Sequence, residues 1–261
     1  MALTVEGRAR KDILDAAFSV GQTGAHLAPS LSLVEIAIAV LKNKDPERDS
    51  FILSKGHGAL GYYAVMHQLE MITDEQFQSF EVNGGEFPGQ PSRSSSNGIE
   101  YSSGSLGMGL SYGVGVAYAK RAVNGKVYVV LGDGELNEGS IWEAASLASQ
   151  LKLGNLIAVV DNNGMQSDGF CEEIINMDMM KLWTAHGWHV VKCNGHSVEE
   201  LEAALKEIKQ DHPLVVLGQT IKGKGVSFME KNNEWHHHVL KEQEYWLAVN
   251  EIGERYGLCE E

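Results

Sequence analysis

Two apolar runs joined by a helix-length segment restrict the fold of this chain more than any other feature. Residues 126–132 read KVYVVLG and residues 156–161 read LIAVVD, and both have the length and β-branched content of buried strands. The segment between them, SIWEAASLASQLKL at 140–153, predicts a helix. A strand–helix–strand unit is almost always right-handed and makes its two strands parallel. We therefore expect an α/β fold built on a mostly parallel sheet.

The alternation of strands and helices continues along the rest of the chain. A parallel sheet built in this way carries helices on both faces. Ser30 or Ser32 is the expected N-cap of the second helix, because Glu35 follows Ser32 at the spacing of a capping box. Further strands are predicted at 51–53, 189–195 and 213–221, and further helices at 6–20, 30–41, 104–122, 197–209 and after the glycine-rich turn that follows residue 53.

Length and composition exclude several classes of protein. With 261 residues and no linker-like segment, we expect residues 1–261 to form a single domain. The net charge of −14 argues against a nucleic-acid partner, which would need a basic surface. Neither a signal peptide nor a membrane span is recognisable. The odd cysteine set, Cys171, Cys193 and Cys259, has no CxxC spacing and indicates a reducing, cytoplasmic location.

Glycine is unusually dense in the predicted helix at 104–122. Each glycine inside a helix costs about 1 kcal/mol relative to alanine, so a close approach to another helix or to a ligand is expected. A tightly packed core helix explains the density equally well. The small residues form two stripes, one of Gly107, Ser111 and Gly115 and one of Gly109, Gly113 and Ala117. The loop expected at 83–103 is long enough to be functional.

Polar residues follow both runs where the predicted strands end. Asp133 lies between two glycines after the first run, and Asn162 and Asn163 follow the second. The carboxyl ends of parallel strands share one edge of a sheet, which is where ligands bind in such folds. Asp133, Asn163 and the carbonyl of Met165 would supply three of the oxygens that Mg²⁺ requires. Two ordinary turns are the alternative interpretation, but their position after consecutive strands favours a site.

The ordered segments of this chain carry a resemblance to a known family. The pattern of GDG followed after about thirty residues by NN resembles the thiamin diphosphate motif. The segments TGAHLAPSLSLVEI, LSKGHGALGYYA, YSSGSLGMGLSYGVGVAYAKR and QTIKGKGVS…EWHHHVL are similar, in this order, to the N-terminal half of transketolase. The α subunits of pyruvate dehydrogenase-type enzymes share the first motif but not this whole set. The resemblance implies the thiamin diphosphate-binding fold, its diphosphate-binding domain in particular.

The resemblance implies a role for each matching residue. Asp133, Asn163 and Met165 correspond to the Mg²⁺ ligands, and Asn163 also to a cofactor contact. The catalytic positions are His26, His236 and Glu138, with His26 also binding sugar hydroxyls and Glu138 at a subunit contact beside the cofactor. The remaining contacts with thiamin diphosphate are His57, Gly104, Ser105, Leu106, Gly134, Lys222 and His236.

The residues alone leave some of these roles open. His26 lies in a glycine-flanked break and can exchange protons near neutral pH, but a buried structural histidine is the alternative. The run from His236 to His238 is also compatible with a solvated surface. Lys222 is either a phosphate contact or a loop lysine, and Glu138 also suits the start of a helix as a favourable charge.

One position departs from the family pattern. The segment FPGQPSR corresponds to one that normally reads Pro-Gly-His-Pro, so Gln90 replaces a histidine that contacts the donor sugar. Glutamine keeps a donor and an acceptor but does not titrate. We therefore expect an unusual ketose as donor, such as a branched or sulfonated sugar. Arg93 and nearby serines either bind its anionic group or form a solvated loop.

The family mechanism also needs a glutamate that contacts the aminopyrimidine ring of the cofactor. In full-length transketolases it comes from a second domain across the dimer interface, and we expect this pyrimidine-binding domain to be absent from this chain. The chain is then one subunit of a split transketolase, inactive alone and assembled as an α₂β₂ heterotetramer that acts on sugar phosphates or sulfonates. Two alternatives remain: another thiamin-dependent reaction, such as 2-oxo acid decarboxylation or deoxyxylulose phosphate synthesis, and a non-catalytic cofactor-binding module.

Overall fold

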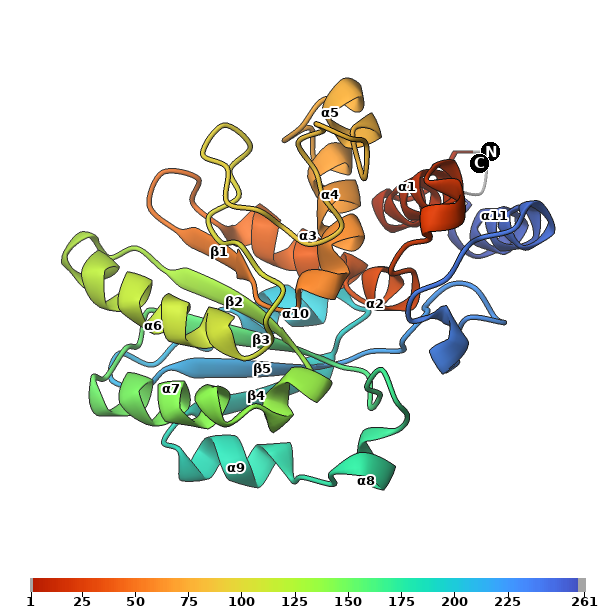
Figure 1. Cartoon of the computed structure of the whole chain (residues 1–261). Helices are drawn as coiled ribbons and strands as arrows, with labels where there is room; N and C mark the ends of the chain where they lie inside the picture. Colours follow the sequence, from red (N-terminus) through yellow and green to blue (C-terminus); the bar gives the residue numbers. More distant parts are fainter. Residues whose placement is uncertain (1, 258–261) are drawn as a thin grey trace.

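Five parallel strands form one sheet in the order β1-β2-β3-β5-β4 (Figure 1). The computed structural model describes residues 2–257, so Cys259 lies outside the described residues. Every neighbouring pair of strands is parallel, which confirms the predicted strand–helix–strand unit and makes the sheet parallel throughout. The strands are β1 (Ser50–Leu53), β2 (Val127–Gly132), β3 (Leu156–Asn162), β4 (His189–Asn194) and β5 (Leu214–Gln219).

Alternate residues of the central strands supply two separate apolar cores. In β2, Tyr128 and Val130 belong to one core, whereas Val127, Val129 and Leu131 belong to the other. All residues of this strand are buried. A strand covered on both faces reads as a continuous apolar run, which is why the sequence gives no alternation here.

Helices cover both faces of the sheet, as expected (Figure 1). On one face α6 and α7 pack together with α6 against β2, and α9 packs against β4. On the other face α3 packs against α10 and α4, and α1 lies between α4 and α11. The helices are α1 (Val5–Ser19), α2 (Ala28–Leu31), α3 (Val34–Asn43), α4 (Ala59–Gln68), α5 (Asp74–Gln78), α6 (Met108–Lys120), α7 (Gly139–Gln150), α8 (Cys171–Ile174), α9 (Met179–Ala185), α10 (Val198–Ala204) and α11 (Glu242–Tyr256).

The capping box expected at Ser32 and Glu35 is wrong. The second predicted helix is broken into α2 and α3, and α3 begins only after Leu33. The Ser32 hydroxyl donates to Asp161 Oδ2 at 2.6 Å, and Glu35 pairs with Arg10 at 2.7 Å. Both side chains are used in buried tertiary bonds, which satisfy them better than a helix end would. Four helices, α5, α8, α9 and α11, had no predicted counterpart, and the helix expected at 197–209 ends early.

The two small-residue stripes of α6 have different surroundings. A Cβ on Gly109 would collide with Ser54, and one on Gly113 would lie 2.6 Å from Val129 Cγ2, so this stripe packs closely on β1 and β2. A Cβ on Gly115 would meet nothing within 4 Å. The expected close approach is therefore made by Gly109 and Gly113 and also by Gly107 of the other stripe, whose Cβ would lie 2.6 Å from Glu138 Cβ, while Gly115 faces outward.

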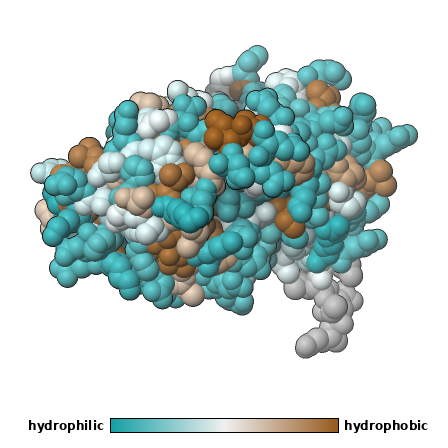
Figure 2. All heavy atoms as spheres, turned by 90° about the horizontal axis from the view of Figure 1, so that it is seen from below, coloured by the Kyte–Doolittle hydropathy of each residue, from teal (hydrophilic) through white to brown (hydrophobic). Residues whose placement is uncertain are grey.

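The surface is mostly hydrophilic, with separate apolar patches on the face shown in Figure 2. Exposed apolar side chains include Met108, Tyr112 and Tyr118 of α6 and Leu147 of α7. Among residues 2–257, no helix is long and apolar enough to cross a membrane.

Candidate active site at the carboxyl ends of the strands

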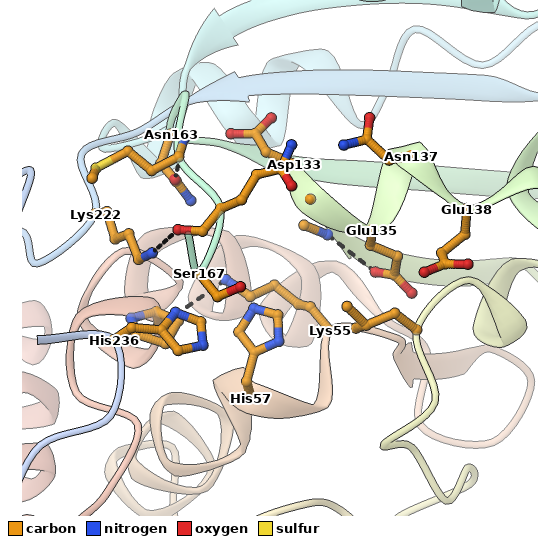
Figure 3. Close-up of a pocket in the computed structure, with 16 residues that line it drawn as sticks. Lys55, His57, Asp133, Glu135, Asn137, Glu138, Asn163, Ser167, Lys222 and His236 are labelled. Atoms are coloured by element: carbon orange, nitrogen blue, oxygen red, sulfur yellow. Dashed lines mark hydrogen bonds between the residues drawn. The ribbon is translucent and has the colours of Figure 1, made fainter. Parts of the chain in front are cut away.

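The carboxyl ends of four strands open onto one cavity of about 280 Å³, here called the strand-end cavity. His57 follows β1, Asp133 follows β2, Asn163 follows β3 and Lys222 follows β5, and Figure 3 shows these side chains around the same space. The volume is close to the lower end of the range of small-molecule sites, about 300 Å³. The topology thus brings together residues that lie up to 165 positions apart in the chain, as expected for a parallel sheet.

Asp133 is a buried carboxylate held by two donors. Its Oδ1 accepts from Asn162 Nδ2 and its Oδ2 accepts from the Gly164 N–H, both at 2.6 Å. Burial raises the pKa of Asp133 to about 6, even though these bonds favour the charged form. A cation beside the carboxylate would offset the cost of its burial.

Two further oxygens line the cavity next to Asp133. Asn163 Oδ1 accepts from the Met165 N–H at 3.1 Å, which leaves a second lone pair. The backbone bonds within residues 164–171 use the carbonyl oxygens of Gly164 and Gly169 rather than that of Met165. In residues 2–257 no group of three or more His, Cys, Asp or Glu side chains is arranged for a metal. An ion held by this oxygen set would complete its shell with water or ligand oxygens, as Mg²⁺ usually does.

Lys222 supplies a cation to the opposite wall of the cavity. Its Nζ donates to the Gln166 carbonyl at 2.7 Å (Figure 3) and to Asn233 Oδ1 at 3.2 Å. Burial, with repulsion from Lys55, lowers the pKa of Lys222 to about 8. An anion in the cavity would restore the charged form, so this wall is suited to a negatively charged ligand.

Lys55 is fixed at the cavity by a buried ion pair with Asp161. Their side chains are 1% and 0% exposed. Asp161 also accepts from the Ser32 hydroxyl at 2.6 Å and from the Thr220 hydroxyl. Burial alone would raise the pKa of Asp161, but the Lys55 ammonium and these bonds hold it below its ordinary value. The pair therefore keeps a second cation in place beside Lys222.

Glu135 ties the start of α6 to the end of β2. Its carboxylate accepts from the Gly107 N–H at 2.9 Å, from the Gly132 N–H at 3.2 Å and from the Ser54 hydroxyl. Gly107 has a φ of 82°, which favours glycine. These bonds hold the adjoining Leu106 at the cavity wall.

Three histidines from distant segments meet beside the strand-end cavity. The ring centroids of His26 and His57 each lie 5.4 Å from that of His236. Burial, with the nearby His237, lowers the pKa of His26 to about 4, and burial, with Lys222, lowers the pKa of His236 to about 3. Burial and then Lys55 lower the pKa of His57 well below its ordinary value.

All three rings of this cluster are therefore neutral near pH 7. Each neutral imidazole offers one donor and one acceptor nitrogen. Such a set can bind hydroxyl groups and exchange a proton with them.

The other predicted site residues take different positions. Gly134 and Glu138 line the strand-end cavity, whereas Gly104 and Ser105 are not among its lining residues. His26 and Gln90 line a second, smaller cavity beside the histidines.

Arg93 is brought to neither of these cavities. Its backbone N–H donates to Ser102 Oγ at 2.8 Å, and its segment turns toward a separate hollow lined also by Lys44, Glu100 and Lys120. An anionic group bound beside Gln90 would therefore not meet Arg93 in this arrangement.

Sequence reasoning missed several residues of the site. Lys55 could have been predicted from the sequence. It comes just after the strand predicted at 51–53, as Asp133 comes just after the strand predicted at 126–132, and the ends of both strands share one edge of the sheet. Asp161 is a charge inside an apolar strand, which itself indicates a buried partner. Gln166 and His237 gave no such signal, since only the folded loops bring them to the cavities.

Comparison with known proteins agrees with this geometry. Residues 20–259 match the family described as "Transketolase, thiamine diphosphate binding domain". The chain is 41% identical over 241 residues to one subunit of the apulose-4-phosphate transketolase of Actinobacillus succinogenes, covering 89% of this chain and 87% of that protein. It is 37% identical to the 6-deoxy-6-sulfo-D-fructose transketolase subunit SqwG of a Clostridium species, covering 89% and 90%.

Solved structures show the same fold. A transketolase mutant from Pichia stipitis superposes with a TM-score of 0.84 at 30% identity over 96% of this chain. The transketolase from Campylobacter jejuni gives a TM-score of 0.83 at 28% identity over 97% of this chain. The chain spans 41% and 43% of these two longer proteins.

Proposed function

This chain belongs to the family of transketolase thiamine diphosphate-binding domains, and on that premise we propose that it is the cofactor-binding subunit of a two-subunit transketolase. The enzyme moves a two-carbon ketol unit from a ketose to an aldose. The observation that carries this proposal is that a set of candidate metal-binding oxygens and a histidine cluster lie side by side at one edge of the sheet. The oxygen set around Asp133 lies beside a cluster of neutral histidines, and a mere cofactor holder would have no use for the second feature.

The strand-end cavity fits the diphosphate end of thiamin diphosphate with Mg²⁺. Asp133, Asn163 and the Met165 carbonyl would hold the ion, and Lys222 and Lys55 would neutralise the diphosphate charge. The fit rests on the chemistry of these groups, because a buried carboxylate with a raised pKa and a buried lysine with a lowered one both call for opposite charge. When bound, the cofactor supplies the ylid carbon for ketol transfer.

The histidine cluster handles the hydroxyl protons of the sugars. Neutral His26 accepts a proton from a ketose hydroxyl as the carbon–carbon bond breaks and returns one to the acceptor oxygen. His236 and His57 orient the reacting groups by hydrogen bonds. Because Leu106, Gly134 and Glu138 also line the strand-end cavity, they bound the space in which the cofactor lies.

A second polypeptide completes this site. The relatives from Actinobacillus succinogenes and Phocaeicola vulgatus are each named as a single subunit of an apulose-4-phosphate transketolase, and the match spans 87% and 86% of their lengths. We assign the pyrimidine-binding domain to a separate subunit, treat residues 1–261 as one diphosphate-binding domain, and expect an α₂β₂ assembly. The donor is an anionic ketose other than the common ones, because Gln90 stands where the family has histidine.

The test is reconstitution of the complex. The chain is mixed with the candidate partner encoded beside it, with Mg²⁺ and thiamin diphosphate, and ketol transfer is followed from xylulose 5-phosphate and from branched and sulfonated ketoses. Each of the two proteins by itself serves as a control. Transfer that requires both proteins supports the proposal, whereas turnover by this chain alone contradicts the split arrangement. A formed, cofactor-loaded complex that transfers from no donor contradicts the transketolase activity.

A further inference from the structure

The second cavity, with a volume of about 130 Å³, lies beside the histidine cluster and is called here the Gln90 cavity. It shares no lining residue with the strand-end cavity, but His26 joins the two because its ring lies 6.2 Å from that of His57. Its polar side chains include those of His26, Glu81, Gln90 and His237. A ligand reacting at the histidine cluster would therefore extend directly into this cavity.

Two backbone hydrogen bonds fix His237 against His26. Ala25 and His238 form an antiparallel bridge, in which each N–H donates to the other's carbonyl at 3.0 Å. The rings of His26 and His237 consequently meet edge to face, with their centroids 4.8 Å apart. A Cβ on Gly24 would lie 3.1 Å from His237 Cε1, so the position of this ring also depends on glycine there. The bridge and the ring contact thus hold His237 in the cavity wall, and its side chain is also exposed to solvent there.

Gln90 lines the cavity and carries a buried acceptor that has no partner within the described residues. Within residues 2–257, Gln90 Oε1 is buried without a hydrogen bond, and so is the neighbouring Ser103 Oγ. A Cβ on Gly56 would collide with Gln90 Oε1, so the amide lies directly on the loop that carries His57. A buried polar atom without a partner costs free energy, and a hydroxylated ligand in the cavity would satisfy the amide of Gln90 once it turned away from Gly56.

The far wall of the cavity is acidic. Glu81 has a φ of 56°, an uncommon conformation for a residue other than glycine, and its N–H donates to the Phe87 carbonyl at 3.1 Å. This conformation places Glu81 Oε1 against Gly89. Of the described residues that line the cavity, none is lysine or arginine. A phosphate or sulfonate here would face a carboxylate and neutral rings, whereas a hydroxyl would find donors and acceptors.

Building on the proposed function, we propose that His237 determines donor specificity. Together with His26 and Gln90 it forms a subsite for uncharged, hydroxyl-bearing carbons of the ketose, whose acidic wall at Glu81 does not suit the anionic group of the donor. The subsite thus selects donors by the hydroxyl pattern of their chain. The anionic group is bound elsewhere in the complex.

The first experiment compares donors with and without such a hydroxylated chain. In the reconstituted complex, His237→Ala is measured with the best donor among xylulose 5-phosphate and the branched and sulfonated ketoses of the reconstitution assay. It is also measured with hydroxypyruvate, which delivers the same two-carbon unit with loss of CO₂. We expect KM for the ketose to rise about tenfold, which corresponds to the loss of one or two hydrogen bonds. The kinetic constants for hydroxypyruvate should stay within about twofold of those of the wild-type complex. His237→Gln should recover part of the loss, and His212→Ala, at an exposed position, should change neither donor.

A second variant tests the charge of the subsite. Glu81→Gln should change by no more than about twofold the ratio of kcat/KM for this best ketose donor to kcat/KM for the same ketose without its anionic group. If the anionic group lay beside Glu81, removing the negative charge would raise this ratio about tenfold or more. That result would overturn the assignment of an uncharged ligand.

The two proposals fail in different ways. If the wild-type complex transfers from neither hydroxypyruvate nor any ketose, the proposed function fails. If wild-type transfer is normal but His237→Ala affects both donors equally, or neither, the function stands and the role of His237 is wrong.

Discussion

The strand-end cavity and the Gln90 cavity are neighbours, yet they differ in whether their polar groups have partners within the chain. In the first, charged groups are bonded within the chain: Asp133 has two donors at 2.6 Å, and Lys55 is paired with Asp161. In the second, neutral groups predominate, and buried atoms such as Gln90 Oε1 have no partner within residues 2–257. One cavity is preorganised before any ligand arrives, and the other is completed by what it binds.

This difference suits the two tasks of the proposed enzyme. A cofactor is bound in every turnover and has fixed charges, so its site gains from rigid, ion-paired groups. A sugar must enter and leave, and its hydroxyls are recognised by groups that are satisfied only while it is bound. Variants that remove charge should therefore affect folding and cofactor binding, whereas variants of the neutral groups should affect only the sugar.

The largest effect is expected from breaking the buried ion pair. Lys55→Met leaves Asp161 as an uncompensated buried charge, and we expect it to lower the free energy of unfolding by about 3–5 kcal/mol. The double variant Lys55→Met/Asp161→Leu should recover most of this loss, because it removes both charges. Lys181→Met is the matched control, since Lys181 is 85% exposed in its ion pair with Asp178 and its loss should change stability far less than Lys55→Met.

Urea unfolding at pH 7 measures all these variants. Equal losses for Lys55→Met and Lys181→Met would show that the charged cavity is not preorganised by the pair. The comparison between the two cavities would then lose its energetic basis.

Removing Lys222 should affect binding more than folding. Lys222→Met takes away a charge-assisted contact with the diphosphate, and we expect thiamin diphosphate to bind about 10–100-fold more weakly in the presence of Mg²⁺, which corresponds to about 1.5–3 kcal/mol. The free energy of unfolding without cofactor should not fall, because the buried lysine already has a lowered pKa. Calorimetric titration with cofactor measures the first effect. Wild-type affinity in the variant would place the diphosphate elsewhere.

Asp133→Asn should abolish Mg²⁺-dependent cofactor binding and remove one pH dependence of folding. The pKa of Asp133 is raised to about 6, so the folded chain binds an extra proton between about pH 4 and 6, and its stability is lost as pH rises through that range. The variant should lack this loss, because an amide does not titrate. It keeps one acceptor oxygen for the two donors that bond Asp133, so no net gain in stability is expected at pH 7. Thermal unfolding at pH 5 and pH 7 tests this expectation. A variant whose stability falls between these two pH values as much as that of the wild type would show that Asp133 does not titrate in this range.

The two cavities were also unequally predictable from the sequence. The parallel sheet is predicted by the order of strands and helices, and the positions of Asp133, Asn163 and Lys222 are predicted by their place just after a strand. These positions could be predicted because the carboxyl ends of parallel strands share one edge of the sheet, independently of how the side chains pack. The break between α2 and α3 could not be predicted, because the role of Ser32 depends on Asp161, far away in the sequence.

The neutral cavity depends on loops, which local patterns do not describe. His237 reaches His26 through the bridge between Ala25 and His238, a pairing of segments that lie far apart in the sequence. Arg93, predicted beside Gln90, lies instead in another hollow because the loop at 83–103 turns back on itself between Ser94 and Ile99. Where backbone bonds between distant loops decide the outcome, sequence spacing carries no information.

The smallest expected effect is a difference between histidines in the pH at which their rings take up a proton. Burial lowers the pKa of His26 to about 4 and that of His236 to about 3, whereas His67, despite partial burial, has a raised pKa because it bonds Asp74 and Asp12. In a pH titration followed by the histidine ring signals, His67 should titrate above about pH 6.5, and the other two should stay neutral down to about pH 5.

The sign of the stability change follows from these shifts. The low-pKa rings lower the stability of the fold as pH falls from about 6.5 toward 4, whereas the contribution of His67 is present below about pH 6.5 and lost as pH rises through its folded pKa. A His67→Gln variant removes the second titration and should leave the first unchanged. If His26 instead titrated near its ordinary pKa of about 6.5, the Gln90 cavity would gain positive charge near neutrality, and its preference for uncharged hydroxyls would have no electrostatic basis.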